Sequence, residues 1–326
     1  MKTKIIRLAV LVALTMFSAC APHIHLDFLG GDALQEKVLV PSSAKDKILA
    51  VNVSGVIASI DSPGLFDKEG DIVSRIYTRL QLAQKDPAVK GIILLLDTPG
   101  GEVTASDIIY HEILRFKETS RKPVVALMMG IAASGGYYVA SACDYIVCHP
   151  STITGSIGVI AMFPELHKLM DKVGVSVNVV KSGEMKDAGS PFKKMTRDDH
   201  DVFQGMIDDM YNQFLSVVYK NRKNVLSMEQ LKILADGRIY TANQALDHKL
   251  VDAIGYFDEA LDNVLRLASV KRAKVVTYTF FPNRKTNIYA MSNSQSNPLA
   301  SPHLYEKIIP SLKPGFYYLW LPKTTR

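Results

Sequence analysis

The sequence predicts an α/β fold built around a largely parallel β-sheet. Short runs of β-branched and apolar residues alternate with amphipathic stretches of helical period, and this alternation is typical of βαβ units. Of the 326 residues, 48% are hydrophobic and 21% are charged, which allows a sizeable core and argues against wholesale disorder. The length suffices for one large domain or two ordinary ones.

The elements can be placed from the apolar periodicity. The long segment 196–223 begins with Thr196 and carries Asp198 and Asp199 in its first turn, as helix N-termini often do. The pattern predicts strands at residues 48–53, 91–96, 124–128, 145–148, 176–180 and 274–280. It predicts helices at residues 72–82, 108–114, 137–143, 196–223, 228–234, 241–248 and 257–268. Beyond residue 271 the pattern decays.

The N-terminus has the pattern of an export signal. Lys2, Lys4 and Arg7 precede an apolar run at residues 8–16, and small residues close this run before Cys20. The uncharged run is shorter than the roughly 17–25 residues of a membrane-spanning helix, which favours a secretory signal. Small residues before a cysteine resemble a bacterial lipobox, so we expect Cys20 to be acylated and to become the mature N-terminus. An uncleaved signal anchor is the alternative.

These patterns divide the chain into four parts. Residues 1–19 are the expected signal peptide, and residues 20–46, which are rich in turn residues, are an expected membrane tether. Residues 47–268 form the expected main domain, and residues 269–326 form a C-terminal extension. The extension contains a polar stretch at 292–301, expected to be a mobile loop. It ends in an aromatic segment at 314–322, for which a docking edge, a membrane-interface contact and simple packing remain open.

Charge and cysteine content argue against several classes of protein. The formal net charge of +6 falls to +3 without the basic residues of 1–19, and no basic stripe interleaved with aromatic residues is present, so nucleic-acid binding is not expected. Three cysteines make no disulfide framework. Cys143 and Cys148 are five positions apart on an expected extended segment and would face opposite sides, so we expect them to be buried and unpaired. No cysteine or histidine cluster has the spacing of a metal site.

A strand-to-helix turn around one serine is a first candidate for chemistry. Small residues at 130–136 flank Ser134, between the expected strand 124–128 and a helical run that starts at Tyr137. A serine at a helix N-terminus has its Oγ beside free N–H groups and the positive end of the helix dipole. The arrangement is that of a nucleophile elbow, although the motif is not G-x-S-x-G. A helix-capping serine in a tight turn is the alternative.

A glycine turn follows the expected strand 91–96. In the segment from Asp97 to Gly101, glycines let backbone N–H groups approach a ligand because no Cβ intervenes. An oxyanion hole is built from such N–H groups. A plain strand-ending turn explains the segment equally well.

A serine nucleophile needs a base within hydrogen-bond reach. The histidines to consider are His149, His167, His200 and His248. None of them lies in a segment that looks built around a site. A lysine can act instead once burial leaves it neutral, and Lys186 lies in a glycine-flanked loop, although a surface lysine is the alternative. Ser156, in a small apolar segment, is either an acceptor for the amine or a buried serine bonded to backbone.

Together these segments resemble the signal peptide peptidase A family of serine proteases in its shorter, single-domain form. The resemblance rests on D-T-P-G-G at 97–101, G-x-A-A-S-G-G-Y-Y at 130–138, T-G-S-I-G-V-I at 154–160, K-S-G-x-x-K-D at 181–187 and D-G-R-I-Y-T-A-x-Q-A-L at 236–246. It covers roughly residues 48–267. Five motifs in one order are far more specific than any one of them.

The resemblance implies a crotonase/Clp-protease-like superhelix of ββα units with C-terminal helices, and a serine peptidase domain at 47–268. It implies a Ser-Lys dyad in which Ser134 is the nucleophile, Lys186 is the general base and Ser156 orients the lysine. It implies an oxyanion hole at the N–H groups near Gly101 and Gly135. The implied substrates are remnant signal peptides and other apolar peptides. The implied assembly is a ring-like homo-oligomer whose active sites draw on adjacent subunits, with no cofactor and no metal.

Two other functions were weighed. A crotonase-type acyl-CoA enzyme shares the fold, but the export signal and the serine turn speak against it. A non-catalytic envelope lipoprotein scaffold is opposed by the intact Ser134, Lys186 and Ser156. The family usually has an N-terminal transmembrane anchor, where this chain has Cys20, so the mode of anchoring is open. The expected location is the bacterial cell envelope, with the catalytic domain facing the periplasm or the cell exterior.

Overall fold

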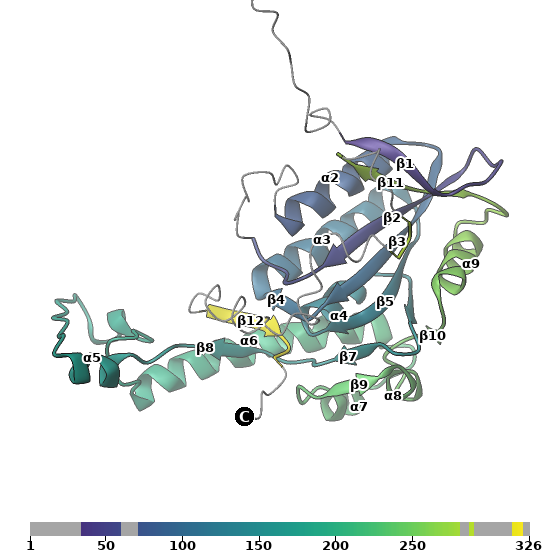
Figure 1. Ribbon diagram of the computed structural model, residues 1–326. Helices are drawn as coiled ribbons and strands as arrows, with labels where there is room; N and C mark the ends of the chain where they lie inside the picture. The colour runs from purple at the N-terminus through teal and green to yellow at the C-terminus, as the bar shows by residue number, and fades with distance from the viewer. Residues whose placement is uncertain (1–33, 60–70, 281–286, 290–314, 322–326) are drawn as a thin grey trace, which may run out of the picture.

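The structure is a computed structural model that describes residues 34–59, 71–280, 287–289 and 315–321 (Figure 1). The expected signal peptide, Cys20 and the polar stretch 292–301 lie outside the described residues. Within those four ranges, no helix is long and apolar enough to cross a membrane.

The described elements alternate along the chain as the sequence predicts. The strands are β1 (Gln35–Val40), β2 (Lys47–Ser54), β3 (Val89–Thr98), β4 (Gly100–Glu102), β5 (Val124–Ala133), β6 (Tyr145–Cys148), β7 (Ile153–Gly155), β8 (Ile160–Met162), β9 (Ile239–Thr241), β10 (Ala253–Ile254), β11 (Lys274–Thr279) and β12 (Gly315–Leu319). The helices are α2 (Ile72–Lys85), α3 (Val103–Ser120), α4 (Gly135–Ala140), α5 (His167–Val173), the 3₁₀-helix η2 (Glu184–Asp187), α6 (Arg197–Arg222), α7 (Met228–Leu234), α8 (Ala242–Asp247) and α9 (Phe257–Leu267).

The centre of the molecule is a mainly parallel sheet with the strand order β1-β11-β2-β3-β5-β6-β10. Strands β2, β3, β5, β6 and β10 all pair in parallel, and β1 is antiparallel to β11 at the edge. Strand β7 pairs in parallel with the carboxyl end of β5 and antiparallel with β9. The fold class is therefore α/β with a mainly parallel sheet, as predicted.

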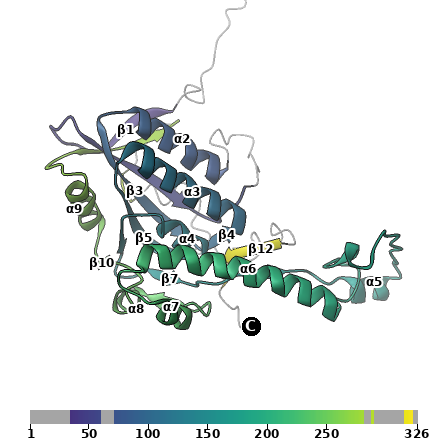
Figure 2. The same cartoon turned by 180° about the vertical axis from the view of Figure 1, so that it is seen from behind.

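Both faces of this sheet are covered, which explains why its strands are almost continuously apolar. Along β3, Ile92 and Leu94 belong to the core on the face covered by α2 and α3, whereas Ile93 and Leu95 belong to the core under α9. Figures 1 and 2 show α2 and α3 on one side and α9 on the other. Each fully buried aliphatic side chain of this kind contributes about 1.5–3 kcal/mol to the free energy of folding.

Most of the predicted elements are confirmed. The strands predicted at 48–53, 91–96, 124–128, 145–148 and 274–280 correspond to β2, β3, β5, β6 and β11. Helix α6 begins after Thr196, whose hydroxyl accepts the N–H of Asp199 while the Asp199 carboxylate accepts the N–H of Thr196. This reciprocal capping box fixes the helix start that the sequence predicts.

The strand predicted at 176–180 is wrong. Its valines have the alternating spacing of a strand, but the segment lies outside the sheet with no regular secondary structure. Val180 is 98% exposed, and Val175, Val177 and Val179 are also exposed. Strand propensity depends on a neighbouring strand to pack against, and this segment pairs with no described strand.

Two segments beyond the predicted main domain join the fold. Strand β1 lies within residues 20–46, predicted as a tether, and pairs antiparallel with β11. Strand β12 comes from the aromatic segment near the C-terminus and forms a small second sheet with the order β4-β12-β8. The predicted tether and extension therefore both contribute strands to the folded body.

A long projection extends from the body, and we call residues 163–206 the arm. It comprises α5, η2, the loops around them and the N-terminal part of α6. Figures 1 and 2 show α6 running from the body out to the end that carries α5. The body end of α6 is anchored by Phe214, Leu215 and Val218, which are buried.

Candidate active site

Ser134 occupies a strained turn between β5 and α4. Its backbone has φ 53° and ψ −113°, a left-handed conformation that is uncommon for a residue with a Cβ and is concentrated at functional sites. Its N–H donates to the carbonyl oxygen of Gly155 at 2.7 Å. The side chain is 1% exposed, and its Oγ has no hydrogen-bond partner among the described residues. The turn therefore holds a buried serine hydroxyl that no other described side chain or backbone group binds.

Ser156 lies beside Ser134 because their strands are paired. Strands β5 and β7 run parallel, with Ala133 opposite Gly155, and each serine is the next residue along its strand. Neighbouring strands are about 4.8 Å apart, so the two serines leave the sheet side by side. Ser156 also has a positive φ, 50°, and its N–H donates to the carbonyl oxygen of Arg238 at 2.7 Å. The two predicted serines are thus together at one edge of the sheet.

The glycine turn after β3 packs directly against the serine turn. A Cβ built on Gly100 would lie 2.6 Å from the amide nitrogen of Gly135, and a Cβ on Gly101 would lie 1.9 Å from the carbonyl oxygen of Ile57. The Thr98 hydroxyl accepts the N–H of Gly100 at 3.1 Å, which fixes the turn. Only glycine allows these backbones to come so close. The structure therefore brings Gly101 and Gly135 to the same place as Ser134.

Two tyrosines that follow the serine fix α4 in place. The Tyr137 hydroxyl donates to the carbonyl oxygen of Leu250 at 2.7 Å, and the Tyr138 hydroxyl donates to Oδ1 of Asp107 at 2.6 Å. Burial, with a further contribution from Asp107, raises the pKa of Tyr138 well above its ordinary value, so its hydroxyl stays protonated. The sequence contains this pair in the serine motif, but nothing in its pattern identifies Asp107 as the partner.

Lys186 is the exception among the predicted site residues, because it lies on the arm. It belongs to η2, and its backbone N–H donates to the carbonyl oxygen of Gly183. Its side chain is exposed and forms no hydrogen bond or ion pair with any residue in the described ranges. The structure therefore does not join Lys186 to Ser134 within one chain.

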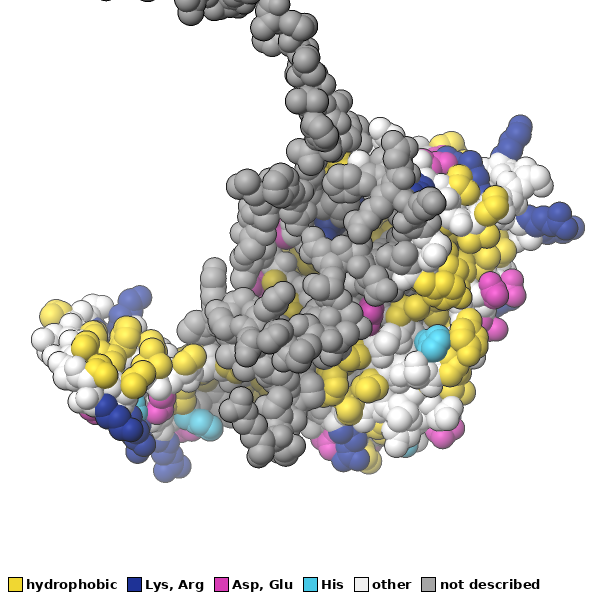
Figure 3. Space-filling view, in the orientation of Figure 1, with side chains coloured by type: hydrophobic (Ala, Val, Ile, Leu, Met, Phe, Trp, Pro, Cys, Tyr) yellow, Lys and Arg dark blue, Asp and Glu magenta, His cyan; other side chains and the backbone are white. Residues whose placement is uncertain are grey.

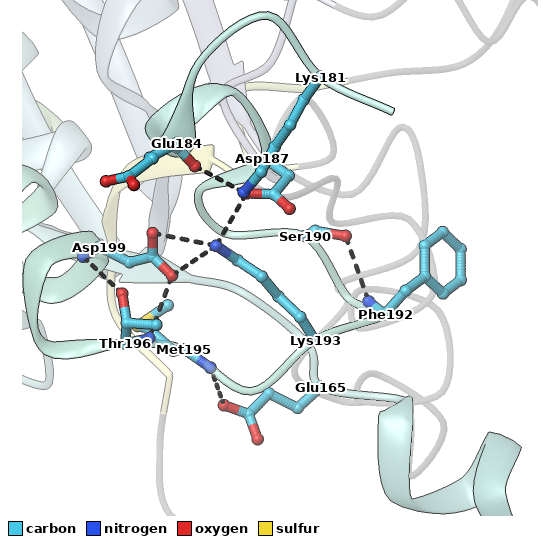
Figure 4. A network of polar contacts seen from close by, with 10 residues as sticks. All are labelled: Glu165, Lys181, Glu184, Asp187, Ser190, Phe192, Lys193, Met195, Thr196 and Asp199. Atoms are coloured by element: carbon cyan, nitrogen blue, oxygen red, sulfur yellow. Dashed lines mark hydrogen bonds and ion pairs between the residues drawn. The ribbon is translucent and has the colours of Figure 1, made fainter. Parts of the chain in front are cut away.

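A network of charges fixes the loop that carries Lys186 (Figure 4). Both Lys181 and Lys193 bond Oδ1 of Asp187, at 2.8 and 2.9 Å, and Lys193 also reaches Asp199 at the start of α6. These two lysines lower the pKa of Asp187 to about 2. Asp187 is thus paired with the lysines on either side of it, and Lys186 is left out of the network.

The length of α6 separates the arm from the serine. Asp199, which anchors the loop of Lys186, is fifteen residues before Phe214, whose ring packs 5.0 Å from that of Tyr138. At 1.5 Å per residue this interval is about 22 Å. A lysine side chain is far shorter than this interval. The arm carries Lys186 away from the serine of its own chain.

Among the described residues, the four histidines considered above do not take the place of Lys186 as a base beside Ser134. His149 bonds Ser151 and lies edge-on to Tyr256, and His248 lies against Tyr240. His167 and His200 are on the arm, beside Glu165 and Asp201. In the part of the chain that the structure covers, none of them bonds Ser134. Nor does that part contain a group of three or more His, Cys, Asp or Glu residues that could hold a metal ion. Cys143 and Cys148 are buried and free, as predicted.

Comparison with known proteins identifies the family to which this chain belongs. The profile of peptidase family S49 matches residues 116–271, and that of Clp protease matches residues 67–152. A signal peptide peptidase SppA of Enterococcus faecium is 36% identical over 251 residues, which cover 77% of this chain and 72% of that protein. Protease 4 of Haemophilus influenzae is 37% identical over 71% of this chain and 36% of its own length.

The name of a more distant relative states that protein's catalytic type. The chloroplastic serine protease SPPA of Arabidopsis thaliana is 26% identical over 81% of this chain and 38% of its own length. The match to the Clp protease profile agrees with the mainly parallel sheet and its flanking helices. The chain belongs to peptidase family S49 and is a serine peptidase with a crotonase/Clp-protease-like fold.

Proposed function

We propose that this serine peptidase uses Ser134 as its nucleophile and that its general base is Lys186 of a neighbouring copy of the chain. The observation that carries the proposal is the contrast between the two residues. Ser134 lies in a buried, strained turn against two glycines, whereas Lys186 lies on an arm that leads away from it, and neither side chain has a hydrogen-bond partner among the described residues. A lysine so placed can reach a serine of another subunit.

The surface of the arm supports such an assembly. Exposed apolar side chains gather on it, as Figure 3 shows. They include Leu166, Leu169, Val173, Val175, Val177, Val179, Val180, Met185 and Phe192. Exposed apolar surface of this extent is typical of interaction sites. A ring-like homo-oligomer in which each arm lies on the next body would cover this surface and complete each active site.

The reaction follows from these roles. Nζ of a neutral Lys186 takes the proton of Ser134 as Oγ attacks the peptide carbonyl. The N–H groups near Gly101 and Gly135 stabilise the resulting oxyanion, each donor contributing about 2.7–4 kcal/mol. Lys186 then gives its proton to the leaving amine, and water hydrolyses the acyl-enzyme. Ser156, beside Ser134, orients the lysine amine through its hydroxyl.

The substrates we propose are apolar peptides, among them remnant signal peptides, and the enzyme is held at the cell envelope by its N-terminal segment. Support comes from the Enterococcus relative, which is named a signal peptide peptidase, and from the apolar run that ends at Cys20. The catalytic domain would then face the periplasm or the cell exterior. Mass spectrometry of the membrane-extracted protein would test whether Cys20 carries acyl chains.

The test of the dyad is cleavage of an apolar peptide by the full chain and by Ser134→Ala and Lys186→Ala. Each variant should lose activity by about 10⁴-fold or more. Ser141→Ala, a buried serine capping the same helix, and Lys194→Ala, an exposed lysine of the arm, are the matched controls and should keep it. If Lys186→Ala cleaves like the parent, the base lies elsewhere.

A pH profile supplies a second test. Because the base must be a neutral amine and a lysine loses its proton only at alkaline pH, the rate should rise with pH. A rate that is flat from acid to alkaline pH would argue against a lysine base. Mixing the two inactive variants tests whether the base comes from a second copy.

A further inference from the structure

The edge of the central sheet at which its parallel strands begin carries exposed basic side chains. Strands β11, β2, β3 and β5 are neighbours in the sheet. At this edge Lys47 lies opposite Lys274 on one side and Val89 on the other, and Ile92 lies opposite Val124. The segments that lead into the four strands therefore lie next to one another. We call their exposed cations the basic edge: Lys45, Lys85, Arg121, Lys271 and Arg272.

The charge of the basic edge is largely uncompensated. None of its five side chains forms an ion pair with a residue in the described ranges. Most acids of the surrounding segments are already paired with other lysines: Asp86 with Lys47 at 2.9 Å, Asp46 with Lys90 at 3.6 Å and Asp144 with Lys117 at 2.8 Å. Glu118, in the last turn of α3, is exposed and stays without an ion pair there. The basic edge therefore presents a net positive charge.

The basic edge lies at the opposite end of the sheet from the candidate active site. Strand β5 runs from Val124 at this edge to Ala133, which directly precedes Ser134. At about 3.3 Å per residue the strand spans about 30 Å. Figure 3 shows Lys and Arg side chains projecting at the end of the molecule where, in Figure 1, the β1–β2 turn and the loop before β11 lie. A ligand on the basic edge is therefore too far away to touch the reacting serine.

The row of cations fits an extended array of negative charges. Four neighbouring strands at about 4.8 Å spacing give the row a width of about 14 Å. Charges interact over about 8 Å at physiological ionic strength, so adjacent cations of the row act together. The segments 45–47, 85–90, 117–122 and 271–274 contain no aromatic residue on which a nucleic-acid base could stack. Anionic lipid headgroups in a bilayer therefore match this surface better than a nucleic acid does.

The length of the N-terminal segment allows the basic edge to reach a membrane to which Cys20 is anchored. Thirteen residues separate Cys20 from Leu34, and they can extend to at most about 45 Å. Strand β1 begins with Gln35 opposite Thr279, at the other end of β11 from Lys274. The segment is longer than the sheet is high, so the anchor permits either end of the sheet to face the bilayer. The charges then determine which end does.

We propose that the basic edge lies on the surface of an anionic lipid bilayer and that this contact orients the enzyme. The inference rests on the proposed function only for the anchoring at the cell envelope. Each Lys or Arg near an anionic surface strengthens binding about fivefold, so five together orient a chain that its anchor already holds at the bilayer. Ser134 then faces away from the lipid. A peptide must extend about 30 Å from the bilayer surface to reach it.

Chemical labelling of lysines tests this orientation on the full chain. The protein is reconstituted in vesicles of phosphatidylcholine, or of equimolar phosphatidylcholine and phosphatidylglycerol, and is labelled with a membrane-impermeant amine reagent that mass spectrometry locates. Lys45, Lys85 and Lys271 should react at least about threefold more slowly in the anionic vesicles. About 1 M salt, where the screening length is about 3 Å, should abolish the difference. Lys194 on the arm and Lys232 on α7, both exposed, should react equally in the two vesicles.

Two double variants test whether the charges themselves make the contact. Lys271→Glu combined with Arg272→Glu reverses two charges of the basic edge, and labelling of Lys45 in anionic vesicles should rise to its rate in neutral ones. Lys168→Glu combined with Lys172→Glu makes the same change of charge on α5 of the arm and should leave the slow labelling of Lys45 as in the parent. All four altered side chains are exposed, and a parental circular dichroism spectrum checks that both variants fold.

The inference is overturned if the lysines of the basic edge react equally in the two vesicles, or if their slow labelling persists at high salt or in the variant with Lys271→Glu and Arg272→Glu. Slower labelling with a short DNA duplex, but not with anionic vesicles, would assign the edge to nucleic acid instead. These readouts need no catalysis. An inactive enzyme with a protected basic edge would contradict the proposed dyad and support this inference, and an active enzyme with an unprotected edge would do the reverse.

Discussion

The turn that holds Ser134 and the loop that holds Lys186 are built in opposite ways. Ser134 is buried, has a strained backbone and is surrounded by glycines, small side chains and the apolar core. Lys186 is exposed, on a loop fixed by ion pairs at the end of a long helix. Packing of buried apolar side chains stabilises the body, whereas ion pairs fix the loop of the arm. The apolar side chains of the arm are exposed in the described structure.

This difference indicates which part of the active site a single chain forms and which part needs a second copy. The serine turn and the glycine turn come together within one chain because adjacent strands of one sheet place them there. The lysine is attached to a surface whose apolar side chains are exposed in the described part of the chain. The preformed half of the site is therefore a property of the fold, and we infer that the other half is a property of the assembly.

The largest expected effect is a loss of stability when an ion pair of the body, behind the serine turn, is removed. Asp252 pairs with Arg222, whose side chain is only 5% exposed, and Oδ2 of Asp252 accepts the N–H of Ile146 at 2.7 Å. Asp252→Ala leaves the guanidinium buried without its partner. The free energy of unfolding should therefore fall by about 3–5 kcal/mol, as measured by urea denaturation followed by circular dichroism.

An exposed pair on the arm is the control for that change. Asp201 faces Arg197 across one helical turn at 3.9 Å, and both side chains are largely exposed. Asp201→Ala should change the free energy of unfolding by less than about 0.5 kcal/mol. Equal losses in the two variants would mean that a buried ion pair of the body is no more important for stability than an exposed ion pair of the arm.

A smaller effect is expected from filling the space over the glycine turn. A Cβ on Gly135 would lie 2.5 Å from Oγ of Ser106 and 3.2 Å from Cα of Gly100. Gly135→Ala should displace the N–H group that we propose faces the oxyanion and reduce kcat by about 10²–10³-fold, or about 2.7–4 kcal/mol. Steady-state kinetics on a variant with a parental circular dichroism spectrum measure it.

Gly205→Ala is the matched control, because a Cβ there meets nothing within 4 Å. It lies inside α6, where alanine stabilises a helix by about 1 kcal/mol relative to glycine. Its kcat should equal that of the parent. A folded Gly135→Ala variant with parental kcat would show that Gly135 is not part of the proposed oxyanion hole.

The smallest effect is confined to the arm. Hydrogen bonds from Lys181 and Lys193 lower the pKa of Asp187 from 3.8 to about 2, so the stability that Asp187 contributes is present above about pH 4 and is lost as the pH falls towards 2. Asp187→Asn removes the charge at every pH. Amide exchange over residues 181–193 should then be faster at neutral pH, with little change in global unfolding.

The corresponding control is Asp171→Asn on α5, where the carboxylate forms no ion pair with a described residue. Its exchange over residues 181–193 should match that of the parent. In the parent, exchange over the same residues, corrected for its intrinsic pH dependence, should accelerate below pH 4. Identical exchange in the two variants would show that the charge network does not hold the loop of Lys186.

Much of the body could be predicted because its strands, helix starts and turns follow from local sequence patterns. The alternation of apolar residues located the strands of the central sheet, and Thr196 with its acids located the start of α6. The serine and glycine turns were predicted as single motifs, and parallel pairing of their strands explains why they meet. Cys143 and Cys148 are buried and free, as predicted, although only Cys148 lies on a strand, β6.

The rest depended on contacts between distant segments. The valines of 176–180 have a strand pattern, yet they form no strand because the arm carries them away from the sheet. The aromatic tail left three interpretations open, and its residues 315–319 pair with β4 and β8 of the same chain, which no local pattern predicts. Nothing within the loop of Lys186 indicates that Asp187 pairs with the neighbouring lysines or that Lys186 lies far from Ser134.

The central claim is that Ser134 and Lys186 of different copies form one active site, and mixing the two inactive variants tests it most directly. Ser134→Ala and Lys186→Ala are combined in equal amounts, dissociated and reassembled, and differently tagged copies are used to show that mixed oligomers form. If each site takes its serine from one copy and its lysine from the next, random assembly restores about a quarter of the parental activity. If the dyad forms within a single chain, every copy lacks one member, and mixed oligomers that remain inactive would contradict the account.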